Sequence, residues 1–309
     1  LSAVQEGAVL SELGSSLVQI EAELVERNEI LTVHDSHFVE ALEKVDSQGG
    51  GRIDPDTKMS EHSWRAAQIS AGAGIQAVRE LSKGLYDAAF CAVRPPGHHA
   101  TSNQSMGFCF LNNAAIAAQY LVNIGQKVLI VDYDAHHGNG TQDIFYQDPN
   151  VFFVSFHQWP LYPGTGRIEE IGDGHGVGTT MNFPFPTRTT GDYYRKAWEE
   201  IIHPKVATFN PSWLIISAGF DSHRNDPVAS LGLTSGDYAD LTSEIIKVVP
   251  SGRRLVFLEG GYDLEALRLS TAAVLRTLAG DSLHPEKSTQ NGPGKEALEM
   301  IAQFHARNS

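Results

Sequence analysis

Residues 127–140 read Lys-Val-Leu-Ile-Val-Asp-Tyr-Asp-Ala-His-His-Gly-Asn-Gly, and this stretch decides the fold class. Its first part, residues 127–132, is a short run of β-branched and aliphatic residues without polar alternation. Such a run predicts a strand that is buried on both faces, as in a parallel sheet. Two acids, two histidines and two glycines then fall within nine residues. Because the carboxyl ends of strands build the site in open α/β sheets, this stretch also predicts where the chemistry lies.

The rest of the chain repeats the alternation of buried strand and helix. Runs of the same apolar character predict four further strands, at residues 87–93, 151–156, 213–217 and 254–258. Apolar residues at helical spacing predict helices around residues 64–81, 111–122 and 238–248. Thr234, with Asp237 three residues later, is the predicted N-cap of the last of these helices. This order predicts one α/β domain over residues 1–309, with a mostly parallel sheet sandwiched by helices.

Long segments rich in polar residues, glycine or proline separate these elements. They are predicted to be loops and lie at residues 47–63, 94–107, 157–186 and 222–233. Each follows a predicted strand or precedes a predicted helix, which is where binding and catalytic residues are concentrated in α/β proteins. We therefore expect the functional residues in these segments and in residues 132–140.

The composition excludes several classes of protein. Of the 309 residues, 41% are hydrophobic, and no stretch approaches the roughly 20 apolar residues of a membrane-spanning helix. The 23 basic and 37 acidic residues give a net charge of −14. A surface of this charge repels nucleic-acid phosphate and attracts cationic substrates, although it serves solubility equally well. We expect no direct nucleic-acid or membrane partner, and the oligomeric state stays open.

The cysteines and the start of the chain bear on the compartment. Cys91 and Cys109 lie in apolar surroundings, which predicts free buried thiols in a reducing environment, although the sequence alone also allows a disulfide. No basic start followed by an apolar run indicates a signal peptide, so a cytoplasmic location is expected. The first residue is Leu1 rather than Met, so we also expect that the start is trimmed.

Three residues behind two predicted strands have the chemistry of metal ligands. Asp134 and His136 are two apart in an extended segment, so both side chains leave on the same face. Asp221, just past the strand predicted at residues 213–217, supplies a third ligand. Two carboxylates and an imidazole suit Zn²⁺ and leave positions for water and substrate. Taken singly, Asp134 is better explained as a helix N-cap and His136 as a satisfied surface imidazole, but the local density of acids and histidines favours a metal.

Two further motifs follow strands. Arg94-Pro95-Pro96-Gly97-His98-His99-Ala100 holds tandem imidazoles in a loop that prolines keep out of a helix, which suits general acid–base work. The same histidines also read as further metal ligands or plain loop residues. In Glu259-Gly260-Gly261-Tyr262-Asp263, the glycines allow a sharp turn that presents Tyr262 as a donor to an oxyanion, or as a tyrosine packed on a helix.

A fourth motif, residues 105–113, contains Gly107, which allows close approach, and Phe108, which suits the wall of a narrow apolar channel. Core packing is the simpler interpretation of Cys109 and Phe110. In this order, the four motifs resemble the zinc-dependent histone deacetylase superfamily with its acetylpolyamine amidohydrolase and bacterial deacetylase-like relatives. The resemblance runs from about residue 31 to the C-terminal region. The Arg-Pro-Pro start of the His98 motif, and Asn139 where class I enzymes usually carry Asp, resemble the class II branch.

The resemblance implies the arginase–deacetylase fold and removal of acetyl groups from N-acetyl-lysine or related amines. It implies one Zn²⁺ per chain, held by Asp134, His136 and Asp221. It also implies proton transfer by His98, oriented by Asp132, and by His99, oriented by Asn139. Tyr262 is the implied hydrogen-bond donor to the substrate carbonyl. The acyl tunnel is implied at Gly107, Phe108 and Tyr162, and a structural K⁺ at Asp132, Asp134, His136, Ser155 and Phe156.

The sequence departs from the family pattern at three points, and each bears on what the resemblance implies. The usual first strand of the family has no counterpart, which agrees with a trimmed start. Gly138 stands where binuclear arginase relatives carry an acid, which favours one metal over a manganese ureohydrolase. Val228 stands where polyamine-preferring members carry a Glu, which weakens the small-molecule acetylamine alternative. A catalytically silent acyl-lysine binding protein is the remaining alternative, although no expected active-site residue is missing.

Overall fold

The strand predicted first is at the centre of the sheet. In a computed structural model, which describes residues 1–307, β4 (Val128–Asp132) pairs with β5 (Val151–Gln158) on one side and β7 (Trp213–Ala218) on the other. All five residues of β4 are buried, as its continuous apolar sequence predicts. The complete six-stranded sheet is parallel, in the order β3-β8-β7-β4-β5-β6. The predicted class, a parallel α/β sheet, is confirmed.

The outer strands differ more from the sequence prediction. The strand predicted at residues 87–93 is shorter, β3 (Ala89–Cys91), whereas β8 (Arg254–Leu258) has the predicted bounds. The loop predicted at residues 157–186 is wrong in part, because β6 (Thr180–Phe185) lies within it and forms an edge of the sheet. A short antiparallel hairpin, β1 (Gly51–Arg52) and β2 (Lys58–Met59), lies within the loop predicted at residues 47–63.

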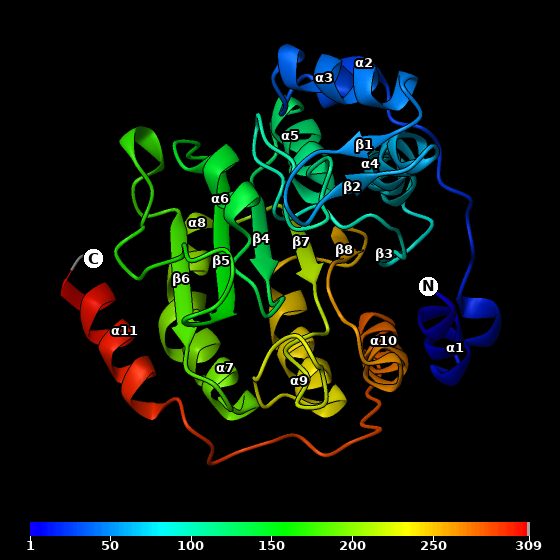
Figure 1. The fold of residues 1–309 in the computed structure, drawn as a ribbon. Helices are drawn as coiled ribbons and strands as arrows, with labels where there is room; N and C mark the ends of the chain where they lie inside the picture. The colour runs from blue at the N-terminus through cyan, green and yellow to red at the C-terminus, as the bar shows by residue number, and fades with distance from the viewer. Residues whose placement is uncertain (308–309) are drawn as a thin grey trace.

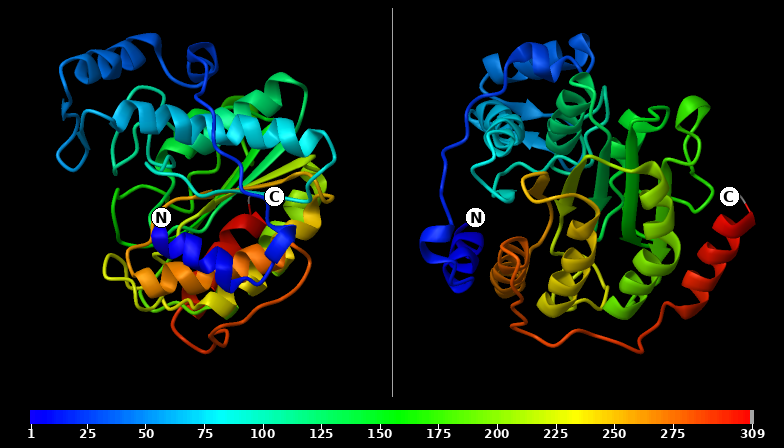
Figure 2. Two further views of the ribbon diagram at one scale, coloured as in Figure 1. Left: turned by 90° about the vertical axis from the view of Figure 1, so that its right-hand side faces the viewer. Right: turned by 180° about the vertical axis from the view of Figure 1, so that it is seen from behind.

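Helices cover both faces of the sheet (Figures 1 and 2). One face packs against α4 (Ser63–Ser82) and α5 (Asn113–Asn123), and the opposite face against the other layer of helices. That second layer comprises α1 (Ser2–Leu10), α7 (Gly191–Ala197), a π-helix (Trp198–Ile202), α8 (His203–Phe209), α9 (Ser235–Ile245), α10 (Leu264–Leu278) and α11 (Lys295–Arg307). Three further helices complete the first layer: α2 (Arg27–Ile30), α3 (Ser36–Ser47) and α6 (Asn139–Phe145).

The three predicted helical stripes correspond to α4, α5 and α9. The capping box at the start of α9 is confirmed, since Thr234 N donates to the carboxylate of Asp237 at 3.0 Å. Cys91 and Cys109 are buried free thiols, as predicted. Among residues 1–307, no helix has both the length and the apolar character needed to cross a membrane.

An extended segment joins α10 to α11 across one end of the molecule, passing beneath α9 and α7 in the view of Figure 1. Glu286 fixes it. The carboxylate of Glu286 accepts hydrogen bonds from Ser235 N at 3.1 Å and from Arg224 Nη2 at 2.7 Å, and it lies 2.7 Å from His223 Nε2. This single side chain therefore ties the segment to the start of α9 and to the loop after β7.

Candidate active site

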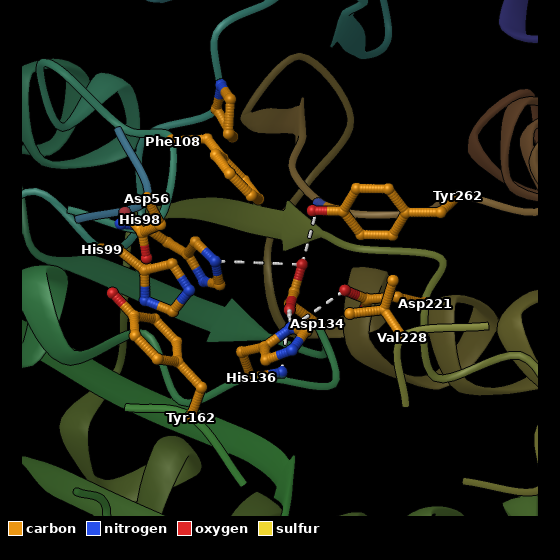
Figure 3. Close-up of a pocket in the computed structure, with 13 residues that line it drawn as sticks. Asp56, His98, His99, Phe108, Asp134, His136, Tyr162, Asp221, Val228 and Tyr262 are labelled. Carbon is orange, nitrogen blue, oxygen red and sulfur yellow. Dashed lines mark hydrogen bonds and ion pairs between the residues drawn. The ribbon is translucent and has the colours of Figure 1, made fainter. Parts of the chain in front are cut away.

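The chemistry-bearing residues of four separate motifs meet in one pocket (Figure 3). They lie in the segments that follow β3, β4, β7 and β8, at the carboxyl edge of the sheet. The residues that the pocket brings together from the sequence analysis are His98, His99, Gly107, Phe108, Asp134, His136, Tyr162, Asp221, Val228 and Tyr262. A parallel sheet explains this convergence, because neighbouring strands all end at the same edge.

Asp134, His136 and Asp221 form a buried cluster with the geometry of a metal site. One ligand atom from each lies within 4.8 Å of the other two. His136 Nδ1 lies 3.0 Å from Asp134 Oδ1 and 3.1 Å from Asp221 Oδ2. Ligand atoms bound at about 2 Å to one tetrahedral ion are separated by roughly 3.3 Å, so these spacings fit a single ion.

The pKa shifts of the cluster also favour a bound cation. Burial alone would lower the pKa of His136, but hydrogen bonds to Asp134 and Asp221 outweigh it and raise the pKa to about 11. Burial and the nearby Asp134 carboxylate raise the pKa of Asp221 to about 6. Without a metal, the three side chains therefore retain a proton that a divalent ion replaces when it binds.

Backbone groups fix the two carboxylates of the cluster. Gly260 N donates to Asp134 Oδ2 at 2.8 Å, and Ala135 N donates to Asp221 Oδ1 at 2.8 Å. A Cβ atom on Gly260 would lie 2.3 Å from Asp221 Oδ2 and 2.6 Å from Asp134 Oδ2. Only glycine allows the backbone this close approach, so the residues present form a cradle shaped around the ligand oxygens.

The tandem histidines have unlike partners. His98 Nδ1 lies 2.9 Å from Asp132 Oδ2, whereas His99 Nδ1 lies 2.7 Å from Asn139 Oδ1. Burial would lower the pKa of His98, but the carboxylates of Asp132, Asp134 and Glu259 outweigh it and raise the pKa to about 10. Burial, and then the charge of His98, hold the pKa of His99 well below its usual value. The surroundings of the two rings therefore favour the protonated form of His98 and the neutral form of His99.

Tyr262 projects into the pocket from the segment between β8 and α10 (Figure 3). Its hydroxyl points toward the side of the pocket that holds Asp134. Burial, and then the Asp134 carboxylate, raise the pKa of the phenol above its usual value. The hydroxyl therefore keeps its proton at neutral pH and can donate a hydrogen bond.

The pocket has a volume of about 180 Å³ and a largely apolar wall. In Figure 3, Phe108 lies above the tandem histidines and Tyr162 below them, whereas Val228 lies on the opposite side of the pocket near Tyr262. The ring of Tyr162 meets the ring of His99 edge-on, with centroids 5.2 Å apart. Cys109 and Phe110 are buried in the core, as the simpler interpretation of that motif had it.

Three acidic residues of this site were not predicted from the sequence. Asp56 lines the pocket from the β1–β2 hairpin and accepts from Gly107 N at 3.2 Å. Glu259, buried beneath the tandem histidines, accepts from Gly97 N at 2.7 Å and His98 N at 3.2 Å. Asp226 contacts the Tyr262 segment. The only available signal was position, since Asp56 and Asp226 lie in segments predicted as loops and Glu259 belongs to the quoted Tyr262 motif.

The residues expected at a K⁺ site lie at the end of β4 and on β5. Asp132 and Ser155 are paired in register, and Ser155 Oγ lies 3.0 Å from His157 Nδ1. The side chain of Phe156 is buried in the core beside Phe183. The side chains of Ser155 and Phe156 therefore contact other side chains of the protein.

Hydrolysis of an amide needs a group that takes a proton from water, a donor for the carbonyl oxygen and a proton for the leaving amine. Around a candidate metal site, the pocket contains His99 with a lowered pKa, and Tyr262 and His98 with raised pKa values. The parallel α/β fold and this combination are typical of an enzyme that hydrolyses amides.

The chain belongs to the histone deacetylase domain family, which matches residues 1–278. It is therefore a hydrolase that acts on amide bonds, and the predicted resemblance and fold are confirmed. It is 40% identical over 292 residues to a "Probable deacetylase" of Archaeoglobus fulgidus, covering 93% of this chain and 80% of that protein. It is 41% identical over 275 residues to "Histone deacetylase 14, chloroplastic" of Arabidopsis thaliana, covering 84% of this chain.

The crystal structure of the HDA15 HD domain superposes with a TM-score of 0.90 at 33% identity, covering 99% of this chain and 86% of that one. Identity above 30% across nearly the whole chain agrees with shared family as well as shared fold. The chain spans 65% of the Arabidopsis chloroplastic relative and 61% of "Histone deacetylase 10, chloroplastic" of Oryza sativa subsp. japonica.

Proposed function

We propose that the protein is a zinc-dependent deacetylase that removes acetyl groups from acetylated lysine side chains in proteins or peptides. The observation that carries the proposal is the buried Asp134–His136–Asp221 cluster, which lies in the same pocket as Tyr262 and the tandem histidines His98 and His99. Two carboxylates and one imidazole suit Zn²⁺ and leave coordination positions for water and substrate. The chemistry supplied by bound Zn²⁺ is polarisation of the amide carbonyl and activation of water.

The remaining steps fall to the side chains of the chain itself. Neutral His99 takes the proton from water as the water oxygen attacks the acetyl carbon. Tyr262 donates a hydrogen bond to the oxygen on which negative charge develops. His98, kept cationic by Asp132, stabilises this charge. The carbon–nitrogen bond then breaks, and a protonated histidine supplies the proton that the leaving amine takes up.

The apolar wall favours an acyl-lysine substrate. Phe108 and Tyr162 offer apolar ring surface in the lining, so a four-carbon lysine stem would gain by burial against them. Val228 places no charge at the side of the pocket where a polycation would need one. Acetylated small amines, the alternative substrate, would reach the same chemistry without that recognition.

A single metal is proposed because there is no room for a second acidic ligand at position 138. A Cβ atom on Gly138 would lie 2.2 Å from Asp132 Oδ2, so an acid in that position would displace the partner of His98. This argues against a binuclear ureohydrolase. The K⁺ at Asp132, Asp134, His136, Ser155 and Phe156, the class II assignment and the cytoplasmic location stay predictions.

The test is release of acetate from an acetyl-lysine peptide and, in parallel, from acetylated polyamines. We expect turnover of the peptide that a chelator abolishes and added Zn²⁺ restores, with about one zinc per chain by elemental analysis. Faster release from polyamines would move the proposal to the small-molecule alternative. Bound zinc without release from either substrate would favour the silent acyl-lysine binding protein, and no bound zinc would overturn the mechanism.

A further inference from the structure

Tyr262 is weakly restrained by its own surroundings. It follows Gly260 and Gly261, and Gly261 has φ of +131°, a conformation open to glycine. Its side chain remains 37% exposed, and within residues 1–307 its hydroxyl has no hydrogen-bond partner. Something outside the Tyr262 segment must therefore hold the backbone if the hydroxyl is to stay at one place in the pocket.

Asp226 supplies that restraint from the loop after β7. Its Oδ2 atom accepts hydrogen bonds from Tyr262 N at 2.7 Å and Asp263 N at 3.1 Å. Its Oδ1 atom accepts from Val228 N at 2.9 Å. Asp226 is itself only 6% exposed, so these hydrogen bonds are shielded from water.

One carboxylate therefore joins two segments that line the pocket, at Val228 and at Tyr262. We propose that Asp226 is a positioning residue, which sets the place of the Tyr262 hydroxyl for the reaction and of Val228 for substrate binding. This inference rests on the proposed function, since it acts through the role assigned to Tyr262. It gives the loop at residues 222–233 an effect on turnover as well as on specificity.

The chemistry of the contact makes it sensitive to a small change. An ionised carboxylate is acceptor-only and satisfies three amide protons with two oxygens. In Asp226→Asn, an NH₂ group replaces one oxygen and faces an amide N–H, so one of the two segments loses its partner. A misplacement of about 1 Å at a reacting group costs roughly 10²-fold in rate.

The first experiment is a double-mutant cycle with the zinc-loaded protein and an acetyl-lysine peptide. We expect Asp226→Asn to lower kcat by about 10- to 100-fold. In the Tyr262→Phe background the same change should lower kcat by less than about threefold, because the group that Asp226 positions is already absent. Asp226→Asn should also raise KM, because it removes the acceptor of Val228 N, and this rise in KM should remain in the Tyr262→Phe background. Effects on kcat that simply multiply would overturn the proposal.

The second experiment does not depend on activity. Amide hydrogen exchange of the peptide that contains Tyr262 and Asp263 should become at least about tenfold faster in Asp226→Asn, since those amides lose their acceptor. Asp148→Asn is the matched control. Asp148 accepts from Asn150 N at 2.8 Å, the same contact two residues along the chain that Asp226 makes with Val228, but neither Asp148 nor Asn150 lines the pocket.

The two experiments separate failure of this inference from failure of the proposed function. Unchanged exchange at Tyr262 in Asp226→Asn would overturn the positioning role, even in an active deacetylase. Faster exchange at Tyr262 in Asp226→Asn, together with no release of acetate by the unmodified protein, would support the contacts of Asp226 and overturn the proposed reaction. Asp148→Asn should leave exchange at Tyr262, kcat and KM unchanged; an equal effect there would show that any lost carboxylate loosens the pocket.

Discussion

The amide of Asn139 decides the proton position on His99. Asn139 Nδ2 donates to His99 O at 3.4 Å and to Met106 Sδ at 3.5 Å, so its Oδ1 atom must face His99 Nδ1. An acceptor at Nδ1 places the ring proton there and leaves the lone pair of Nε2 free. The neighbouring His98 has a carboxylate instead of an amide as its partner, and the pKa values of the two rings are therefore shifted in opposite directions.

A substitution at Asn139 tests this difference. In Asn139→Asp, a negative charge beside Nδ1 raises the pKa of His99, so more of the base is protonated at a given pH. We expect the acidic limb of the pH profile of kcat/KM to move to higher pH by about one to three pH units. The control is Asn123→Asp at the exposed end of α5, which should leave the profile unchanged. A shift toward lower pH would contradict the assignment of His99 as the base.

Loss of the Tyr262 hydroxyl should affect catalysis alone. Tyr262→Phe removes a donor to the developing oxyanion, so we expect kcat to fall by about 10²- to 10³-fold. Zinc content and thermal stability should remain those of the unmodified protein, because the phenol oxygen has no protein partner to lose. Tyr146→Phe, at a half-buried tyrosine outside the pocket, serves as the control. Substantial residual turnover in Tyr262→Phe would remove Tyr262 from the mechanism.

The sequence predicted the candidate ligand and proton-transfer residues better than the residues that hold these groups in position. Asp134, His136 and the tandem histidines stand out because acids and imidazoles cluster behind buried strands. Their assigned roles stay predictions, although the pocket contains them. Asp226 was not predicted, since a carboxylate that accepts backbone amides from a segment 36 residues away leaves no pattern in the sequence.

The elements were predicted where burial leaves a uniform pattern. The central strands are continuous apolar runs because both of their faces are covered. β6 was missed because Thr180, Asn182 and Pro184 interrupt its apolar residues. Pro184 is tolerated because β6 lies at the edge of the sheet, where a missing N–H leaves no neighbouring strand unsatisfied. An edge strand thus resembles a loop in sequence for a physical reason.

Glu286, in the extended segment between α10 and α11, should make the stability of the protein depend on pH in the acidic range. Burial would raise the pKa of Glu286, but hydrogen bonds from His223 and Ser235 outweigh it and lower the pKa from 4.5 to about 2. A carboxyl whose pKa is lowered on folding stabilises the protein above its unfolded pKa, and this contribution is lost as pH falls toward the folded value.

Glu286→Gln should therefore lower the Tm at neutral pH, and the Tm difference from the unmodified protein should shrink as the pH falls from 4.5 toward about 2. Thermal unfolding followed by circular dichroism at several pH values measures this. Glu299→Gln, at an exposed residue 3.7 Å from Lys295, is the control and should change the Tm little. A Tm difference for Glu286→Gln that is the same at every pH would contradict the explanation.

At the scale of the molecule, a bound metal should stabilise the folded state in addition to its role in the proposed reaction. Asp134 and His136 follow β4 whereas Asp221 follows β7, so the complete cluster exists only when the sheet is formed. A ligand that binds only the folded state adds about 2.7 kcal/mol when its free concentration is 100 times its Kd. We expect a chelator to lower the Tm and excess Zn²⁺ to restore it.

The His136→Ala variant is the control for this measurement. It lacks the imidazole ligand, so its Tm should respond much less to chelator or to Zn²⁺ than the Tm of the unmodified protein. Equal responses of the two proteins would mean that the stabilising ion binds elsewhere. Scanning calorimetry together with elemental analysis distinguishes these outcomes.

The arrangement of the pocket on one edge of the sheet also bears on how this protein can diversify. The strands that set stability contribute no side chain to the lining, which comes from segments beyond their ends. Sequence libraries confined to residues 54–56 and 227–228, which lie outside the core clusters, therefore sample new acyl chains and amines without mutating the hydrophobic core. Asp226 borders the second region, so such libraries retain turnover only if this one carboxylate is kept constant.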